Sequence, residues 1–230
     1  LYDTVRNVIC GYQPTSDITF SWQRGEHVQP HMLNFLENHD EQRIASDFFV
    51  GNAEKAIPGM QISLWMNTNP SMVYFGQELG ERGMDAEGFS GLDGRFDAKN
   101  LTKEQKALKK KYVEMLLLAR SEKCLIEGGF YDLMYANYEN HHFDSTKQYA
   151  FLRFLKNEFI LVVSNFYDEK VDISVNIPSE VFEFIKIDAA KVKIATNLIS
   201  KKPFDIKGVE LCTIPLTIPA NDSVIIKFTK

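Results

Sequence analysis

An apolar stretch that ends in consecutive polar residues is the part of this 230-residue sequence best suited to chemistry. Residues 34–41 read Asn-Phe-Leu-Glu-Asn-His-Asp-Glu, so His39 and Asp40 come directly after an apolar segment. A carboxylate beside an imidazole can make directional hydrogen bonds to neighbouring sugar hydroxyls, and an ionised aspartate favours a positively charged, oxocarbenium-like transition state. The alternative, which spacing alone favours, is a strand-to-loop junction in which Asp40 caps the next turn and His39 is merely hydrogen-bonded.

Helix and strand patterns alternate on both sides of this segment. Apolar residues recur at helical spacing over residues 1–9, and Gly11 follows where a left-handed C-terminal cap is common. We predict a short strand at residues 32–36, a helix at 58–66 and a buried strand at 71–75. This alternation is typical of parallel strands joined by crossover helices. In a barrel of parallel strands the carboxyl ends of the strands face the active site, and His39 and Asp40 follow such an end.

The clearest helix signal in the sequence begins at Thr102. Thr102 followed by Gln105 forms a capping box, and an apolar face at helical spacing then continues to a predicted end near Glu122. The residues on that face are Leu108, Tyr112, Met115, Leu116 and Ala119.

Strand patterns dominate after residue 128. We expect a hairpin between residues 149–155 and 159–163, with a turn region of three residues. Residues 171–177 and 224–228 alternate apolar and polar side chains, which predicts half-buried antiparallel strands. Several such strands separated by turns indicate a small β-sandwich of about 100 residues.

Composition and charge restrict the possible partners. Hydrophobic residues make up 44% and charged residues 25%, so neither a disordered tail nor a fibrous repeat is expected. Lys and Arg number 26 against 31 Asp and Glu, and a net charge of −5 supplies no basic footprint for nucleic acid. The longest apolar runs, at residues 62–66 and 159–163, are far shorter than the ~20 residues of a membrane span, so none is expected.

The cysteines and the first residues bear on compartment and completeness. Cys10, Cys124 and Cys212 are odd in number and far apart, which fits neither a disulfide framework nor a zinc site and favours a reducing, cytoplasmic compartment. The sequence opens at Leu1 with no basic stretch and apolar run of a signal peptide, and we expect its first helix to begin upstream. No cofactor is identifiable from the residue pattern.

Two motifs in order carry a resemblance to a known family. Residues 34–41 resemble the motif ending in His-Asp at the seventh barrel strand of the α-amylase family of glycoside hydrolases. Residues 70–80, Pro-Ser-Met-Val-Tyr-Phe-Gly-Gln-Glu-Leu-Gly, are similar to that family's eighth strand and following loop, although Thr68 stands where a glycine is usual. The resemblance covers essentially the whole chain. It implies an α/β fold followed by an all-β one: residues 1–128 as the C-terminal portion of a (β/α)8 TIM barrel and 129–230 as an antiparallel β-sandwich domain.

The resemblance also implies that part of the catalytic machinery lies elsewhere. A complete barrel has about 250 residues, and roughly half of that length precedes the β-rich part here. No segment matches the motifs of the family's aspartate nucleophile and glutamate acid, two carboxyl groups that retaining enzymes hold about 5 to 5.5 Å apart. We therefore expect a missing N-terminal barrel segment as a partner, an inactive chain when alone, and any calcium site in that missing part.

The family's known roles can be carried onto matching residues of the two motifs. By resemblance, Asp40 is the carboxylate that binds sugar hydroxyls and stabilises the distorted transition state, and His39 binds the same sugar. Asn38 lies where some relatives hold a chloride ion, but asparagine is common there without the ion, so Asn38 is expected to be structural. Glu78 is expected to anchor the loop after the eighth strand.

Four further side chains near these motifs receive predictions from their surroundings. Glu37 and Glu41 are expected to be solvated or structural. An aromatic ring can stack on the apolar face of a sugar, and Phe89, in the glycine-rich loop after the eighth strand, is the candidate platform for substrate binding. Trp65, among apolar neighbours in a helix, is predicted to pack in the core.

The resemblance implies a retaining hydrolase, in its complete form, that acts on α-linked glucans such as starch or maltooligosaccharides. An α-glucan transglycosylase is the alternative within the same class, because water and a second sugar compete for the same glycosyl intermediate. From another class, a noncatalytic protein could keep the amylase fold for binding or assembly.

Overall fold

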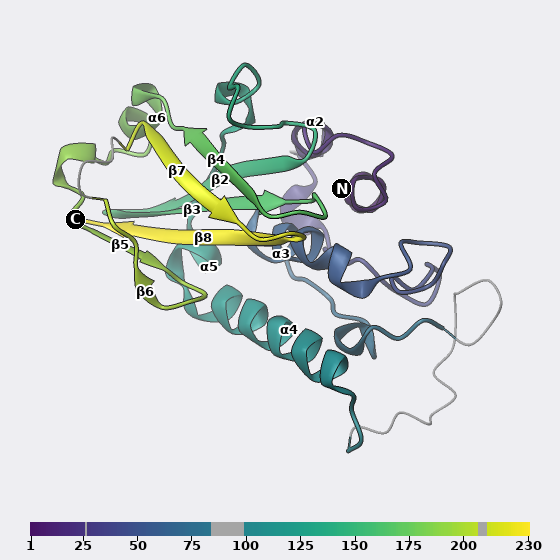
Figure 1. Cartoon of the computed structure of the whole chain (residues 1–230). Helices are drawn as coiled ribbons and strands as arrows, with labels where there is room; N and C mark the ends of the chain where they lie inside the picture. Colours follow the sequence, from purple (N-terminus) through teal and green to yellow (C-terminus); the bar gives the residue numbers. More distant parts are fainter. Residues whose placement is uncertain (26, 84–98, 207–210) are drawn as a thin grey trace.

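A computed structural model describes residues 1–25, 27–83, 99–206 and 211–230 of the chain. Antiparallel strands occupy the C-terminal part, and helices and loops from the N-terminal part pack against one side of them (Figure 1). None of the described helices has the length and apolar character needed to cross a membrane.

Helices and loops make up most of the described part of the region before residue 129. Its elements are α1 (Tyr2–Ile9), α2 (Asp17–Arg24), η1 (Gln29–His31), η2 (Ala53–Ala56), α3 (Ile57–Trp65), η3 (Gln77–Leu79), α4 (Lys103–Ser121) and α5 (Lys123–Glu127), where η marks a 3₁₀ helix. Three of the α-helices confirm the helices predicted from apolar spacing: α1, α3 and α4. Helix α2 was not predicted, because only Ile18 and Thr19 of its eight residues are buried and its apolar pattern is correspondingly short.

The N-terminal ends of two predicted helices match their sequence signals. At α4 the Thr102 side chain accepts a hydrogen bond from Gln105 N–H, and the Gln105 side chain accepts one from Thr102 N–H, which completes the capping box. Helix α3 carries Pro58 in its first turn and is buried on all sides. Trp65 is fully buried at its end, which confirms core packing for this residue.

The two predicted barrel strands are much shorter than expected. Residues 32–36 and 71–75 meet in one parallel bridge between Asn34 and Ser71, with Asn34 N–H donating to Pro70 O at 2.9 Å and Met72 N–H donating to Asn34 O at 2.8 Å. The prediction of full strands was wrong, and so was the burial of residues 71–75, since Phe75 is 58% exposed. A parallel strand needs neighbours on both edges, and within the described residues each segment pairs only with the other.

The region from residue 129 onward contains all the strands longer than one bridge in the described residues. These are β1 (Gly129–Asp132), β2 (Gln148–Leu155), β3 (Glu158–Asn165), β4 (Val171–Asn176), β5 (Ile194–Asn197), β6 (Lys202–Pro203), β7 (Thr213–Ile218) and β8 (Asp222–Thr229). Between them lie η4 (Met134–Ala136), α6 (Ser179–Phe184) and η5 (Ala189–Lys191). Every pairing is antiparallel, in a six-stranded sheet of order β1-β2-β3-β8-β5-β6 and a two-stranded sheet β4-β7.

The predicted hairpin is present with a tighter turn. Leu155 pairs with Glu158, so that two residues form the turn instead of three, and Lys156 adopts a left-handed φ of 54° there. Strand β8 was predicted to be half-buried, but residues 223–226 are all buried. The reason is that β8 is covered on both faces, by α3 on one and by β7 on the other.

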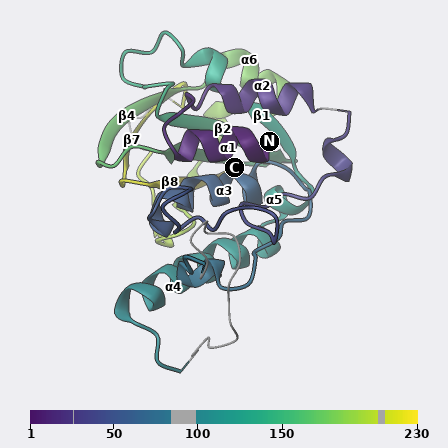
Figure 2. The ribbon, with the colours of Figure 1, turned by 90° about the vertical axis from the view of Figure 1, so that its right-hand side faces the viewer.

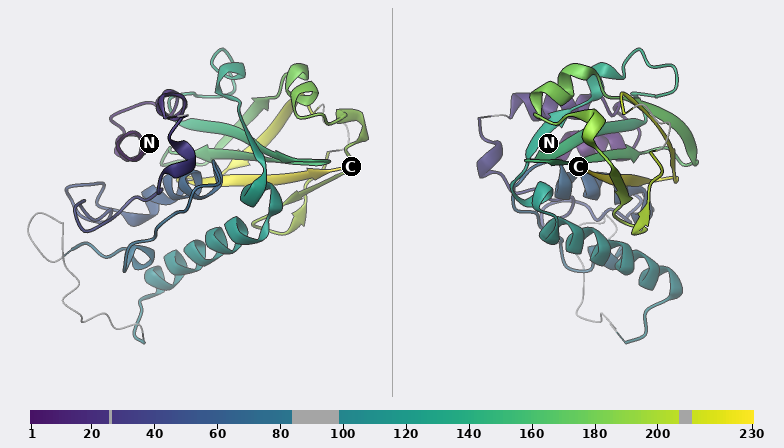
Figure 3. Two further views of the ribbon diagram at one scale, coloured as in Figure 1. Left: turned by 180° about the vertical axis from the view of Figure 1, so that it is seen from behind. Right: turned by 90° about the vertical axis from the view of Figure 1, so that its left-hand side faces the viewer.

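Helices and strands form layers around one continuous apolar core. The β4-β7 pair crosses one face of the larger sheet in Figure 1, while α3 and α5 contact the other, and α4 packs beyond them (Figure 3). Helices α2, α1 and α3 follow one another at one end of the sheet (Figure 2). Gly59 permits this stacking, since a Cβ there would lie 2.7 Å from Ile9 Cδ1 and 2.9 Å from Val5 Cγ1.

Buried Arg153 joins the helical and sheet regions. From β2 its guanidinium donates to Gly128 O at 2.6 Å and Gly129 O at 3.1 Å, and across the interface to Trp65 O at 2.9 Å. Burial lowers the pKa of Arg153 to about 10, which still leaves it charged near neutral pH. The division into domains 1–128 and 129–230 therefore stays a prediction, because buried residues of both regions form one cluster.

Candidate functional site

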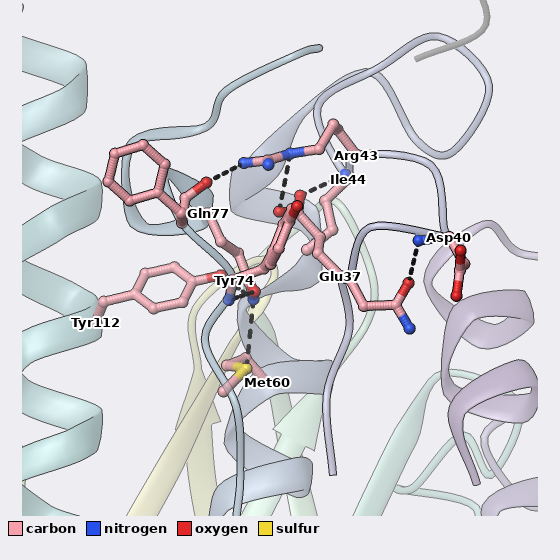
Figure 4. Close-up of polar contacts among 10 residues, drawn as sticks. Glu37, Asp40, Arg43, Ile44, Met60, Tyr74, Gln77 and Tyr112 are labelled. Carbon is pink, nitrogen blue, oxygen red and sulfur yellow. Dashed lines mark hydrogen bonds and ion pairs between the residues drawn. The ribbon is translucent and has the colours of Figure 1, made fainter. Parts of the chain in front are cut away.

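His39 and Asp40 lie at the exposed tip of the loop that follows the Asn34–Ser71 bridge. The His39 Nε2 and Asp40 Oδ2 atoms are 3.3 Å apart, and the two side chains are 78% and 76% exposed. Asn38 holds the backbone of the loop, because its Oδ1 accepts a hydrogen bond from Asp40 N–H at 2.8 Å. In Figure 4 the Asp40 side chain points away from the buried polar cluster beside it.

A buried ion pair closes the base of the same loop. Glu37 Oε2 and Arg43 Nε are 3.1 Å apart, and their side chains are only 1% and 2% exposed. Glu37 Oε1 also accepts a hydrogen bond from Ile44 N–H at 2.6 Å (Figure 4). Glu37 is therefore structural, which is one of the two roles predicted for it, and it is not solvated.

The environment of Glu37 disfavours its charged form. Burial raises the pKa of Glu37 to about 7, although the Arg43 charge and the Ile44 hydrogen bond both stabilise the carboxylate. The negative charges of Glu78 and Glu81 raise this pKa further. The base of the loop consequently holds a carboxyl group that titrates near neutral pH.

The segment after the bridge supports the loop from the other side. Arg43 Nη2 donates to Phe75 O at 2.8 Å, and the guanidinium lies 5.0 Å from the centre of the Tyr74 ring. Gln77 accepts a hydrogen bond from Tyr74 N–H at 3.0 Å and donates to Tyr112 Oη at 3.1 Å (Figure 4). The Gln77 bonds tie the segment that Arg43 contacts to α4, because Tyr112 is a fully buried residue of that helix.

Helix α1 borders the exposed side of the loop. Tyr2 Oη donates to Glu41 Oε2 at 2.9 Å, and the Tyr2 ring stacks on Phe35 with ring centres 5.0 Å apart. Burial, with the neighbouring Glu41, raises the pKa of Tyr2 well above its usual value. Glu41 is thus half-buried and hydrogen-bonded, in agreement with a structural role.

The structure brings most of the predicted site residues into one small area. Asn38, His39 and Asp40 are consecutive in the loop, and Glu78 lies half-buried in η3, close enough for its charge to act on Glu37. Phe89 lies outside the described residues. The functions assigned to all five residues stay predictions.

Two residues were not predicted from the sequence: Arg43, which holds the loop against Phe75, and Gln77, which holds the neighbouring segment to α4. An available signal for Arg43 was its position next to the apolar residues Ile44 and Ala45, where a charged side chain needs a partner if it is buried. Gln77 carried no comparable signal, because its partner Tyr112 is distant in sequence and reaches it only through the packing of α4.

The exposed pair can bind a polyol but cannot by itself cleave a glycosidic bond. Asp40 offers carboxylate oxygens as hydrogen-bond acceptors, and His39 offers ring nitrogens beside them. Glycosidic cleavage with retention needs a nucleophile and a proton donor on opposite sides of the bond, and Asp40 can supply neither role while it serves as the acceptor for hydroxyls. In the described ranges no three His, Cys, Asp or Glu side chains are grouped to hold a metal ion.

Comparisons with known proteins give matches to the fold but none to the sequence. No protein-family model and no curated protein matches the sequence. Solved structures match the fold. They include the maltogenic α-amylase AmyB from Thermotoga neapolitana (17% identity, TM-score 0.64), the α-amylase from Geobacillus thermoleovorans complexed with acarbose (15%, 0.67) and the cyclomaltodextrin glucanotransferase CldA (15%, 0.68).

The matches extend over the whole of this chain but only over part of each solved structure. All three cover 100% of this chain, and they cover 49%, 46% and 43% of AmyB, the Geobacillus enzyme and CldA. The chain thus spans about half the length of these structures. It has the fold of the C-terminal part of α-amylase family structures, an α/β portion of the barrel followed by the antiparallel β-sandwich.

Proposed function

We propose that this chain is the C-terminal part of an α-amylase-like retaining glycoside hydrolase that acts on α-linked glucans or maltooligosaccharides. The observation that carries the proposal is the His39–Asp40 pair at the exposed end of a parallel-bridged segment, in a chain with this fold. The same position in the resembling motif belongs to the carboxylate that stabilises the transition state.

Asp40 and His39 have separate roles in the proposed reaction. The Asp40 carboxylate accepts hydrogen bonds from two neighbouring hydroxyls of the sugar at the cleavage point, and its negative charge stabilises the oxocarbenium-like transition state. His39 donates a hydrogen bond to the same sugar. Their mutual distance of 3.3 Å allows both side chains to contact one ring.

The nucleophile and the proton donor come from another segment in this proposal. A companion barrel segment would supply both groups and pair with the two short parallel segments around Asn34 and Ser71. It would also enclose His39 and Asp40, whose present exposure leaves their hydrogen bonds in competition with water. The 230-residue chain alone is accordingly inactive.

Transglycosylation is the second candidate within the same class. The fold likeness extends to a cyclomaltodextrin glucanotransferase as well as to hydrolases. The two reactions share Asp40 and His39 and differ in whether water or a sugar hydroxyl attacks the glycosyl intermediate.

The test uses the complete gene product that contains this chain, with the 230-residue chain as the control. Maltohexaose is incubated with each protein, and proton NMR follows the anomeric configuration of new reducing ends and the lengths of the products. We expect α-configured products from the complete protein and none from the chain alone.

Products longer than the substrate would indicate transglycosylation. Binding of maltohexaose without any turnover by the complete protein would support a noncatalytic role and contradict the proposal, and turnover by the purified chain alone would contradict the need for a companion segment.

A further inference from the structure

The loop that carries His39 and Asp40 has an exposed tip and a fully buried base. At the base, Glu37 and Ile44 are joined by the 2.6 Å hydrogen bond from Ile44 N–H, so the residues between them form a closed loop. Within this closed loop, Arg43 Nε lies 3.1 Å from Glu37 Oε2. The conformation of the tip is therefore determined by contacts that a substrate would not touch.

Arg43 extends the closure to a second segment of the chain. Its hydrogen bond to Phe75 O and its position over the Tyr74 ring fix the loop against the residues that lead into η3. The planar guanidinium of Arg43 is surrounded by a backbone carbonyl, a carboxylate and an aromatic ring. These three contacts restrict the orientation of Arg43 more than packing alone would restrict an apolar side chain.

A buried ion pair is an unfavourable replacement for apolar side chains in the interior of a protein. Removing two charges from water carries a desolvation penalty, and replacing such a pair with apolar side chains of similar volume is often neutral for stability. Glu37 Oε2 and Arg43 Nε face each other as an ion pair at 3.1 Å, and among the described residues neither atom has a hydrogen-bond partner. Stability alone therefore does not account for a pair of charges at this place.

We propose that Glu37 and Arg43 are positioning residues, a buried clamp that holds the loop so that His39 and Asp40 meet the transition state together. The catalytic part of this inference rests on the proposed function. Neither clamp residue touches the substrate, because both side chains are almost completely buried. A displacement of a catalytic group by about 1 Å can cost roughly a hundredfold in rate, so such a clamp has a measurable effect on turnover.

The decisive variant is the double substitution Glu37→Gln with Arg43→Met in the complete gene product. Glu37→Gln alone leaves the Arg43 charge buried without its partner and is expected to destabilise the fold, whereas the double variant removes both charges and keeps similar volumes. The matched control is Asp47→Asn with Arg82→Met, which removes an acidic and a basic charge from an exposed ion pair. Three quantities are measured for each protein: the urea midpoint of unfolding, kcat and KM for maltohexaose, and amide exchange of the peptide spanning residues 36–45 by mass spectrometry.

For the double variant we expect a parental unfolding midpoint, a kcat lowered about tenfold or more with little change in KM, and exchange of the 36–45 peptide about tenfold faster. The control should match the parental protein in all three quantities.

Parental kcat together with parental exchange would overturn the proposal, and so would faster exchange with unchanged kcat. A parental protein with no turnover at all would contradict the proposed function, and the exchange of the 36–45 peptide would then decide the clamp alone: unchanged exchange overturns it. If the double variant does not fold, the charge pair is a requirement of stability and the proposal is wrong.

Discussion

The sheet region (residues 129–230) and the site region (residues 34–83) complete their hydrogen bonding in different ways. In the sheet region, antiparallel strands pair along most of their length, and most residues of the central strands β2, β3 and β8 are buried. In the site region, parallel segments share one bridge, and side chains such as Arg43 and Gln77 hold the loops to the backbone. Antiparallel strands can be joined by a short hairpin, as β2 and β3 are, whereas parallel segments such as those around Asn34 and Ser71 need a long connection between them.

This difference also separates stability from function. The apolar sheet region contributes hydrophobic burial that depends little on pH, whereas the site region contains a buried carboxyl group and two exposed polar side chains. Substitutions in the two regions should therefore differ in size, in pH dependence and in their effect on activity.

The largest change in stability is expected for Phe159→Ala in the sheet region. The Phe159 ring is fully buried and stacks on Phe228 with ring centres 4.6 Å apart. Its removal leaves a cavity, so the free energy of unfolding should fall by about 3–5 kcal/mol in urea titration. The control Phe184→Ala removes a ring that is 60% exposed and should cost far less. Equal losses for the two variants would show that burial in this sheet does not determine its stability.

An intermediate effect is expected from the titration of Glu37 in the site region. The pKa of Glu37 is raised to about 7 in the folded protein, so the folded state binds more protons than the unfolded state between the ordinary glutamic acid pKa and about 7. Proton binding by Glu37 therefore stabilises the folded state. This stabilisation is complete below about pH 4.3 and is lost as the pH rises through about 7. Urea unfolding of the parental protein should show the loss, by up to about 3 kcal/mol.

Glu37→Gln isolates this titration, because the amide keeps an acceptor for Ile44 N–H but has no proton to release. The difference in unfolding free energy between the parental protein and Glu37→Gln should change between pH 4.5 and pH 8. Glu41→Gln, on the same loop, serves as the control for replacing a carboxyl group by an amide. A constant difference between the parental protein and Glu37→Gln would mean that Glu37 has an ordinary pKa.

The smallest effect is expected at α4, the helix that lies between the two regions in the sequence. Helix α4 packs against η3 of the site region and is followed by α5, which contacts β2 and β3. Thr102→Ala removes the side-chain acceptor of the capping box and should lower the free energy of unfolding by about 1 kcal/mol, as measured in urea. Thr102→Ser keeps the hydroxyl and should be close to parental, and an equal loss in both variants would argue against a capping effect.

The elements that were predictable from sequence are those with local causes. The capping box at Thr102 and the hairpin around Lys156 are each specified by a few consecutive residues, and both are present. The burial of β8 on both faces depends on α3, which is far away in sequence, so alternation alone predicted a half-buried strand. The parallel segments were predicted too long for the same reason, because their length depends on neighbouring strands rather than on their own residues.

The site was predictable at its tip but not at its base. His39 and Asp40 were found because polar residues interrupt an apolar segment and match a family motif. The contact of Arg43 with Phe75 spans 32 residues and arises only when two loops pack together. A pattern of residue types contains no information on such pairings unless charge and burial are considered together.

The most direct test of the account is the turnover of an α-glucan by the complete gene product carrying Asp40→Asn. Asparagine keeps the size and much of the hydrogen bonding but removes the negative charge, so the loss should occur in the transition state and lower kcat and kcat/KM together. We predict a fall of at least about a hundredfold, equivalent to roughly 2.7 kcal/mol of electrostatic stabilisation. The unfolding midpoint should be unchanged, because the Asp40 side chain is 76% exposed. Parental turnover by Asp40→Asn, or its failure to fold, would contradict the central claim that Asp40 acts on the substrate.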